Sequence, residues 1–146
     1  MSPAYQFESR WLQPGADVAT VYDVLEDVAA YPAWWRSVPA VVRLAEDEAL
    51  LLCRSRLPKT IRLVMRPLRQ DRDAGVLHAS LAGDLVGWSR FDLTAVPSGV
   101  VLHYTQQVDT PGRLMSLAGR LARPVLVWNH QQMMRALRED LATRLA

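Results

Sequence analysis

The strongest constraint on the fold of this chain is a succession of strand-like runs between Val38 and Asp109, several of which alternate apolar and polar residues. Alternation with a period of two places successive side chains on opposite faces of a β-strand. Short links that contain glycine, Gly83-Asp84 and Ser98-Gly99, separate some of these runs and are strong hairpin signals. The pattern predicts a meander of antiparallel strands over Ala40–Leu44, Ala49–Arg56, Thr60–Arg66, Val76–Ala82, Leu85–Val96 and Val100–Val108.

The segment before these runs predicts a strand followed by a helix. Tyr5–Leu12 alternates and is typical of a half-buried strand. Asp17 is a suitable N-cap for a helix that we expect to end near Tyr31, because Pro32 follows. A short second helical turn is expected over Ala33–Arg36, and a polar turn is expected over Gln70–Gly75.

The C-terminal segment, Gly112–Ala146, has helical spacing throughout. Its apolar positions recur at steps of three or four residues, which is the spacing of one helix face. Pro124 is expected to kink this helix or to begin a new one. A long helix with one apolar face is the natural cover for the buried face of the meander.

Composition narrows the class of protein. A chain of 146 residues, half of them hydrophobic, corresponds to a single domain over residues 1–146. A domain of this size can fold without a disulfide or a structural metal ion. Cys53 is the single cysteine, so an intramolecular disulfide and a cysteine metal cluster are excluded. The N-terminus has no signal-peptide pattern and no apolar run reaches ~20 residues, so we expect a cytoplasmic protein without integral membrane association. The basic residues are scattered and the net charge is +2, which argues against a nucleic-acid partner.

The order of elements resembles the helix-grip fold of the START-like (SRPBCC, polyketide cyclase/dehydrase-like, birch-pollen-allergen-like) superfamily. Local runs carry the same resemblance to a bacterial branch of it: Asp17–Trp35, Gly83–Gly87 and Arg123–His130. The resemblance spans almost the whole chain. It implies an α+β fold in which a seven-stranded curved antiparallel sheet wraps around the long C-terminal helix, with a hydrophobic small molecule held between them.

Strand pairing can be predicted from the two glycine links. A two-residue turn at Gly83-Asp84 pairs His78 with Ser89, and a turn at Ser98-Gly99 pairs Phe91 with Gln106. A slip of one residue would invert every face. This register predicts an inner face that carries Val76, His78, Ser80, Leu85, Gly87, Ser89, Phe91, Leu93, Leu102, Tyr104, Gln106 and Val108.

Polar residues on this inner face point to a small-molecule site. A buried polar group costs ~1–3 kcal/mol when it lacks a partner, so such groups must bond to each other, to water or to a ligand. The superfamily resemblance implies bulky aromatic residues at the positions of Ser89 and Gln106, so this chain is expected to have a roomier cavity. The predicted ligand-binding residues are Trp35, Leu51, Cys53, Leu63, Met65, His78, Ser89, Phe91, Tyr104, Gln106, Leu126, His130 and Met133.

Two interpretations are open for the histidine on the C-terminal helix and for the pair of adjacent tryptophans. His130 on the apolar helix face is either a ligand contact and acid–base group or a core histidine with a hydrogen-bonded ring. Trp34 and Trp35 either form a lid over the ligand or simply pack against the sheet. Cys53 reads most simply as a small core hydrophobe. No metal site and no cofactor are expected. The two candidate histidines, His78 and His130, have no third ligand, whereas zinc normally takes three or four protein ligands.

Three functions remain open at this point. The first is binding of a hydrophobic small molecule such as a lipid, a quinone or a polyketide. The second is a polyketide cyclase or dehydratase, with His78, Tyr104 or His130 moving a proton. The third is a protein-interaction module with a filled core. A likeness of fold does not decide between them.

Overall fold

The computed structural model describes residues 5–54, 60–109 and 113–146, without the side chains of 113–123 and 125. The expected strand end at Arg56 therefore lies outside the described residues. The elements, in chain order, are β1 (Tyr5–Pro14), α1 (Val18–Glu26), the 3₁₀ turn η1 (Val28–Ala30), α2 (Tyr31–Trp34), β2 (Ala40–Ala45), β3 (Glu48–Cys53), β4 (Ile61–Asp71), β5 (Val76–Gly83), β6 (Val86–Val96), β7 (Gly99–Asp109) and α3 (Arg113–Leu145).

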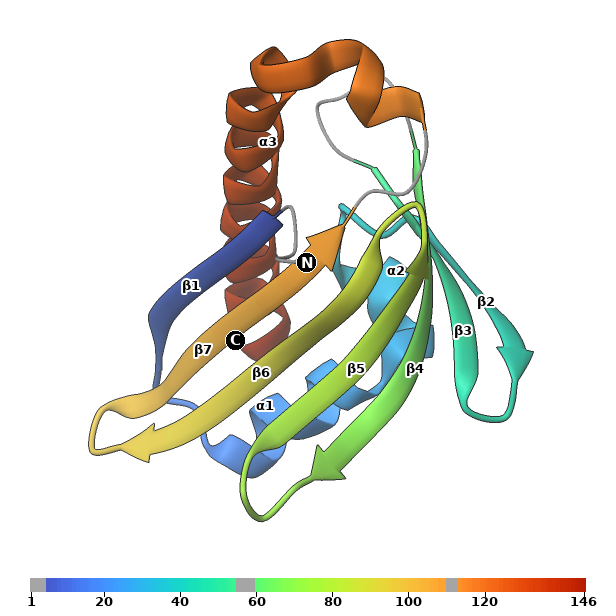
Figure 1. Ribbon diagram of the computed structural model, residues 1–146. Coiled ribbons are helices and arrows are strands. Elements are labelled where there is room, and N and C mark those ends of the chain that lie inside the picture. The colour runs from blue at the N-terminus through green and yellow to red at the C-terminus, as the bar shows by residue number, and fades with distance from the viewer. Residues whose placement is uncertain (1–4, 55–59, 110–112) are drawn as a thin grey trace.

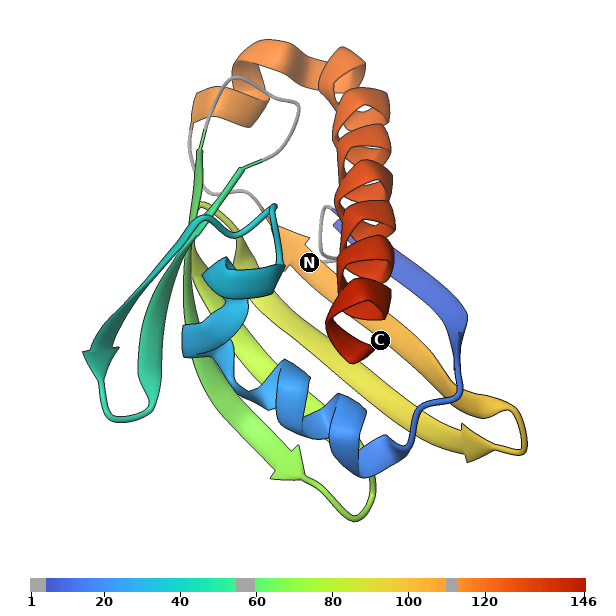
Figure 2. The ribbon, with the colours of Figure 1, turned by 180° about the vertical axis from the view of Figure 1, so that it is seen from behind.

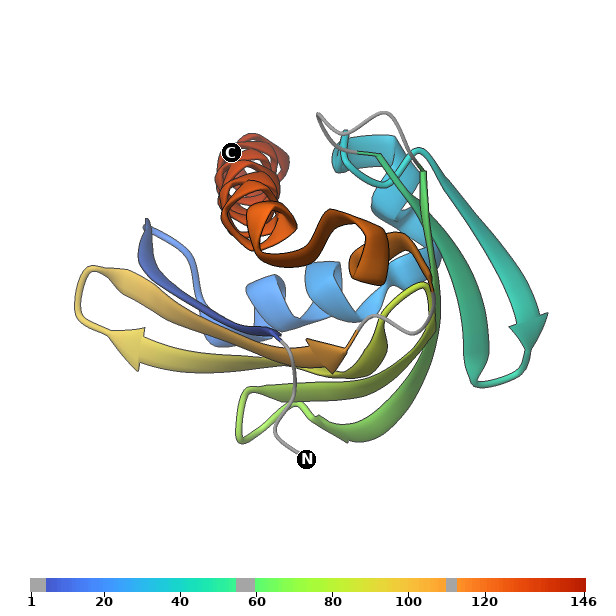
Figure 3. The same ribbon diagram turned by 45° about the horizontal axis from the view of Figure 1, so that its top comes forward.

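All seven strands form one antiparallel sheet in the order β1-β7-β6-β5-β4-β3-β2 (Figure 1). The sheet curves, and the helices lie on its concave side (Figures 2 and 3). The predicted α+β architecture, with a curved sheet and a long C-terminal helix, is confirmed. This arrangement buries residues of β1, β3, β5, β6 and β7, whereas β2 and β4 have no fully buried residue.

The register of the β6–β7 hairpin differs from the prediction by two residues. Phe91 pairs with Tyr104 instead of Gln106, and Val96 pairs with Gly99. The two-residue turn is therefore Pro97-Ser98, one position earlier than expected. Proline has no N–H to give to a strand ladder, so Pro97 is better placed in the turn. A shift of two preserves the faces, and the concave positions predicted for β6 and β7 are correct.

The register of the β5–β6 hairpin is off by one residue, which reverses the faces of β5. Ala79 pairs with Ser89, and His78 pairs with Arg90. The cause lies in the link, because Gly83 pairs with β4 and Asp84 accepts the Arg62 N–H at 2.8 Å. Because of this bonding, an odd number of residues, 82–86, lies between the paired Leu81 and Gly87, whereas a two-residue turn would leave an even number. The inner positions predicted for Val76, His78 and Ser80 are wrong, and the concave face carries Leu77, Ala79 and Leu81 instead.

The first helix begins as predicted but ends earlier. Asp17 caps it by accepting the Thr20 N–H at 2.8 Å. The helix stops at Glu26 instead of near Tyr31, and α2 starts at Tyr31 with Pro32 in its first turn. Proline is tolerated there because the first N–H groups of a helix have no partner within the helix. The expected turn at 70–75 is also shorter, since β4 continues to Asp71.

The core lies between the concave face and the C-terminal half of α3. Leu137 and Leu141 are fully buried and belong to the largest core cluster, with Trp11, Phe91 and Leu102. Pro124 lies inside α3, and the ribbon shows the helix changing direction along its length (Figure 1). Within the described part of the chain, none of the helices combines the length and the apolar character needed to cross a membrane.

Candidate ligand pocket

A pocket of about 500 Å³ opens between the end of α1, the turn η1 and the concave side of β2–β6. Figure 2 shows these helical segments facing the concave surface of the sheet. The wall of the pocket is largely apolar, and charged side chains lie at its mouth. The apolar wall residues are Leu25, Val28, Ala29, Tyr31, Val41, Ala49, Met65, Pro67, Leu77, Ala79 and Phe91.

The register of the sheet explains how the inner wall of the pocket is built. Ala79 faces Pro67 across one hairpin and Ser89 across the next, so the three residues lie side by side on the concave face. All three line the pocket. Small side chains at these positions leave the space that larger ones would fill. Phe91, two residues beyond Ser89, closes the wall and packs against Tyr104 with ring centroids 4.8 Å apart.

Met65, His78, Ser89 and Phe91 are the residues that the predicted ligand-binding set shares with this pocket. His78 borders the pocket, but its ring lies on the convex face and meets the Trp88 ring edge-on at 5.2 Å. Burial, and then the nearby Arg90, lower the pKa of His78. An imidazole on the convex face cannot move a proton within the pocket.

Another part of the predicted set lies in a closed apolar cluster next to the pocket. Leu51 and Cys53 are buried there with Tyr31 and Val38. Leu63, Met133 and Trp35 pack against this cluster. Burial raises the pKa of the Cys53 thiol to about 12, so the sulfur stays protonated and behaves as a small hydrophobe.

Tyr104 and Gln106 form a polar chain behind the pocket wall. The Tyr104 hydroxyl donates a hydrogen bond to Gln106 Oε1, and a hydrogen bond from Ser89 reaches Tyr104. Burial raises the pKa of Tyr104, and the bond from Ser89 offsets this in part. Because Ser89 also lines the pocket, the chain connects the buried phenol with the pocket wall.

His130 lies away from the pocket, in an aromatic stack under α3. Its ring stacks on Phe7 at 3.9 Å between centroids and on Tyr104 at 6.0 Å. Burial lowers the pKa of His130 to about 4, so the imidazole is neutral at neutral pH. Leu126, one turn earlier, packs against the cluster of Tyr5, Leu81 and Val108. Of the α3 residues whose side chains the structure describes, none lines the pocket.

The tryptophan pair, Trp34 at the end of α2 and Trp35 directly after it, packs against the core. Trp34 and Trp35 stack at 5.8 Å, and Tyr31 meets both rings edge-on. The Tyr31 hydroxyl donates to the Leu25 carbonyl, which fixes η1 and α2 against the end of α1. Tyr31 lines the pocket, whereas neither tryptophan does. The aromatic group therefore supports the pocket wall through Tyr31.

Sequence reasoning missed the helical side of the pocket, which includes Leu25 of α1 and Val28 and Ala29 of η1. The sequence contains no signal for the end of α1 at Glu26. A helix that continued to Tyr31 would place Val28 differently. Among the residues that the structure describes, no three His, Cys, Asp or Glu side chains gather in a way that could hold a metal ion.

Comparison with known proteins gives a fold and no close relative. No family model matches the chain, and no curated protein matches it. A START superfamily protein from Mycobacterium smegmatis has a similar structure, with a TM-score of 0.76, 15% identity and 96% of each chain covered. An aromatase/cyclase, ZhuI, from a Streptomyces species gives a TM-score of 0.75 at 12% identity, over 97% of this chain and 93% of that one.

A third solved structure, Ara h 8.0201, gives a TM-score of 0.64 at 12% identity, over 95% of this chain and 98% of that one. All three matches run along nearly the full length of this chain, as the resemblance in its sequence implied. At such low identity they establish architecture and leave the ligand open. The chain therefore has the START/SRPBCC-like helix-grip fold.

Proposed function

We propose that this protein binds a hydrophobic small molecule in the pocket between α1, η1 and the concave side of β2–β6. The observation that carries the proposal is the pocket itself, with a volume of about 500 Å³ and a largely apolar wall. Small-molecule sites are typically clefts of ~300–1,000 Å³ with apolar walls and a few polar groups. Ser89 and Gln70 supply polar groups here.

A pocket-filling variant tests the proposal. Ala79 faces the pocket from β5, whereas Ala82, on the same strand, is exposed on the opposite face. We expect Ala79→Trp to weaken binding of the neutral fluorescent probe N-phenyl-1-naphthylamine at least about tenfold, because the indole occupies the probe's volume. Ala82→Trp is the matched control and is expected to bind as the unaltered protein does.

Circular dichroism melts of both variants establish that each is folded before titration. Equal affinity in Ala79→Trp and Ala82→Trp would contradict the proposed location. No probe binding by the unaltered protein would contradict the proposed function and favour a protein-interaction module.

A polyketide cyclase or dehydratase is the second candidate, and the Ser89–Tyr104–Gln106 chain is the observation that favours it. The bond to Tyr104 fixes the Ser89 hydroxyl in the pocket wall, where it is positioned to orient a bound chain for cyclisation. Tyr104→Phe removes the phenol hydroxyl and keeps the ring. We expect the variant to bind the probe normally and to lose cyclisation of a poly-β-ketone substrate. Unchanged turnover would remove Tyr104 from the mechanism.

A further inference from the structure

We infer that the ligand of this pocket is an amphiphile with an apolar body and a positively charged end. The inference rests on the proposed binding function and adds the charge of the ligand. It follows from the carboxylates at the pocket mouth, which come from two separate elements. Glu26 and Asp27 stand at the end of α1, and Glu46 and Asp47 stand in the β2–β3 turn.

These four carboxylates are exposed, and all four line the same pocket. Among the described residues no cation lies within ion-pair distance of any of them. Glu48 is a fifth carboxylate that lines the pocket, and it forms an ion pair with Arg66 at 3.5 Å. The mouth therefore carries unneutralised negative charge on two sides.

Arg43 is the one arginine or lysine among the described residues that line the pocket. Its guanidinium is held by the hairpin turn, with Nε donating to the Ala45 carbonyl at 3.2 Å and Nη2 to the Glu46 carbonyl at 2.9 Å. These bonds direct two of its donors away from an incoming ligand. Arg43 reduces the negative charge of the mouth without reversing it.

The backbone of α1 adds to the same field. The C-terminus of a helix carries partial negative charge, and α1 has no basic residue in its last turn to offset it. The chain as a whole has a net charge of +2, so the negative mouth is a local departure from the average. At physiological salt, charges act over ~8 Å, so the rim acts on a ligand's end group at the mouth.

Three ligands of equal chain length isolate the effect of charge. We would measure displacement of N-phenyl-1-naphthylamine by decyltrimethylammonium, decanol and decanoate. The expected order of affinity is cation, then alcohol, then anion, with the cation about tenfold tighter than the alcohol at low salt. The difference in affinity between the cation and the alcohol should shrink between about 0.01 M and about 1 M salt, as the Debye length falls from ~30 Å to ~3 Å.

Charge-neutralising variants assign the preference to the rim. Glu46→Gln combined with Asp47→Asn should reduce the cation preference about threefold, because half of the unpaired rim charge is removed. The matched control removes two exposed carboxylates elsewhere, Glu8→Gln in β1 and Asp73→Asn in the β4–β5 turn. This control should keep the full preference.

The possible results separate the inference from the proposed function. If none of the three ligands displaces the probe and the probe itself does not bind, the proposed function fails. If decanol binds but the cation is no tighter, or the anion is tighter, the pocket stands and the inferred charge is wrong. An equal loss of preference in the rim variant and the remote control would also overturn it.

Discussion

At the scale of single residues, burial decides the chemistry of the titratable groups. His130 is held between Phe7 and Tyr104, and its pKa falls to about 4 because a charged imidazole is poorly solvated there. Cys53 and Tyr104 stay protonated for the same reason. The contacts of the His130 ring that the structure gives are aromatic, on Phe7 and Tyr104 under α3.

The lowered pKa of His130 predicts acid sensitivity. As the pH falls from 6.5 towards 4, the unfolded chain takes up a proton that the folded chain does not, so stability decreases. The loss amounts to at most about 3 kcal/mol by the lower end of this range. His130→Phe keeps the stack on Phe7 and cannot titrate, so urea unfolding across the range should show a smaller loss. An unchanged pH dependence in the variant would contradict this account.

At the scale of elements, local pattern predicts which segments are strands and helices, and neighbouring strands decide their faces. The alternation in β6 and β7 was sufficient for their concave residues, because the Pro97-Ser98 turn shifts pairing by an even number. In β5 the same reasoning was wrong. Gly83 bonds to β4 instead of turning directly into β6, and this long-range choice has no local signal.

The pocket residues divide in the same way. Ser89 and Phe91 could be predicted because strand periodicity fixes which side they face. Leu25 and Val28 could not, because the break after Glu26 depends on Tyr31 bonding to the Leu25 carbonyl. Helix periodicity alone favours continuation through that point.

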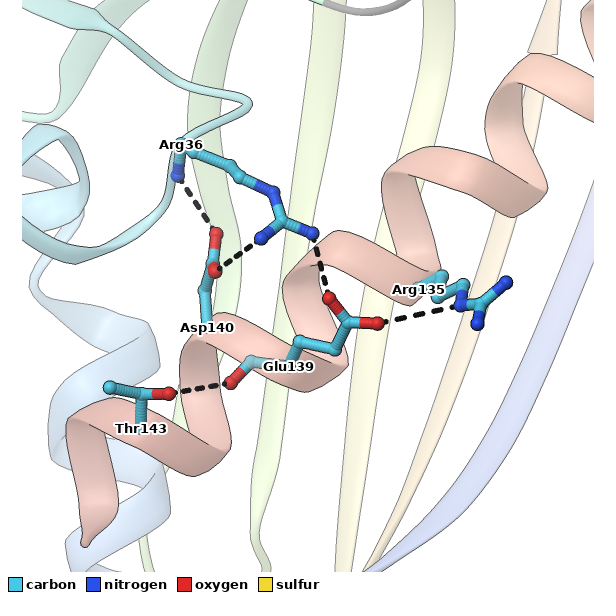
Figure 4. A network of polar contacts seen from close by, with 5 residues as sticks. All are labelled: Arg36, Arg135, Glu139, Asp140 and Thr143. Carbon is cyan, nitrogen blue, oxygen red and sulfur yellow. Dashed lines mark hydrogen bonds and ion pairs between the residues drawn. The ribbon is translucent and has the colours of Figure 1, made fainter.

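At the scale of the whole molecule, a polar network joins α3 to the segment that follows α2 (Figure 4). Asp140 accepts the Arg36 backbone N–H at 3.0 Å and lies 3.3 Å from the Arg36 guanidinium. Glu139 contacts the same guanidinium at 2.9 Å and Arg135 at 3.4 Å. The network fixes α2 relative to α3 and so holds the helical side of the molecule together.

Removing the less exposed carboxylate of this network, that of Asp140, should cost stability. The Asp140 side chain is 14% exposed and that of Glu139 is 52% exposed. We expect Asp140→Ala to lower the free energy of unfolding by about 1–2 kcal/mol, because a charge-assisted bond to a backbone N–H is lost. Glu139→Ala is the control and should cause a smaller loss. Chemical denaturation measures both, and equal losses would contradict the special role of Asp140.

The sequence by itself determined the α+β class, the antiparallel meander and the apolar face of the C-terminal helix, since these follow from residue periodicity. Only the tertiary structure decided where the pocket opens. The sheet closes on α3 through large side chains such as Leu137 and Leu141, whereas small ones such as Ala79 face α1 and η1. Pocket position depends on which side chains meet across the molecule, and that depends on strand register and helix ends set by distant hydrogen bonds.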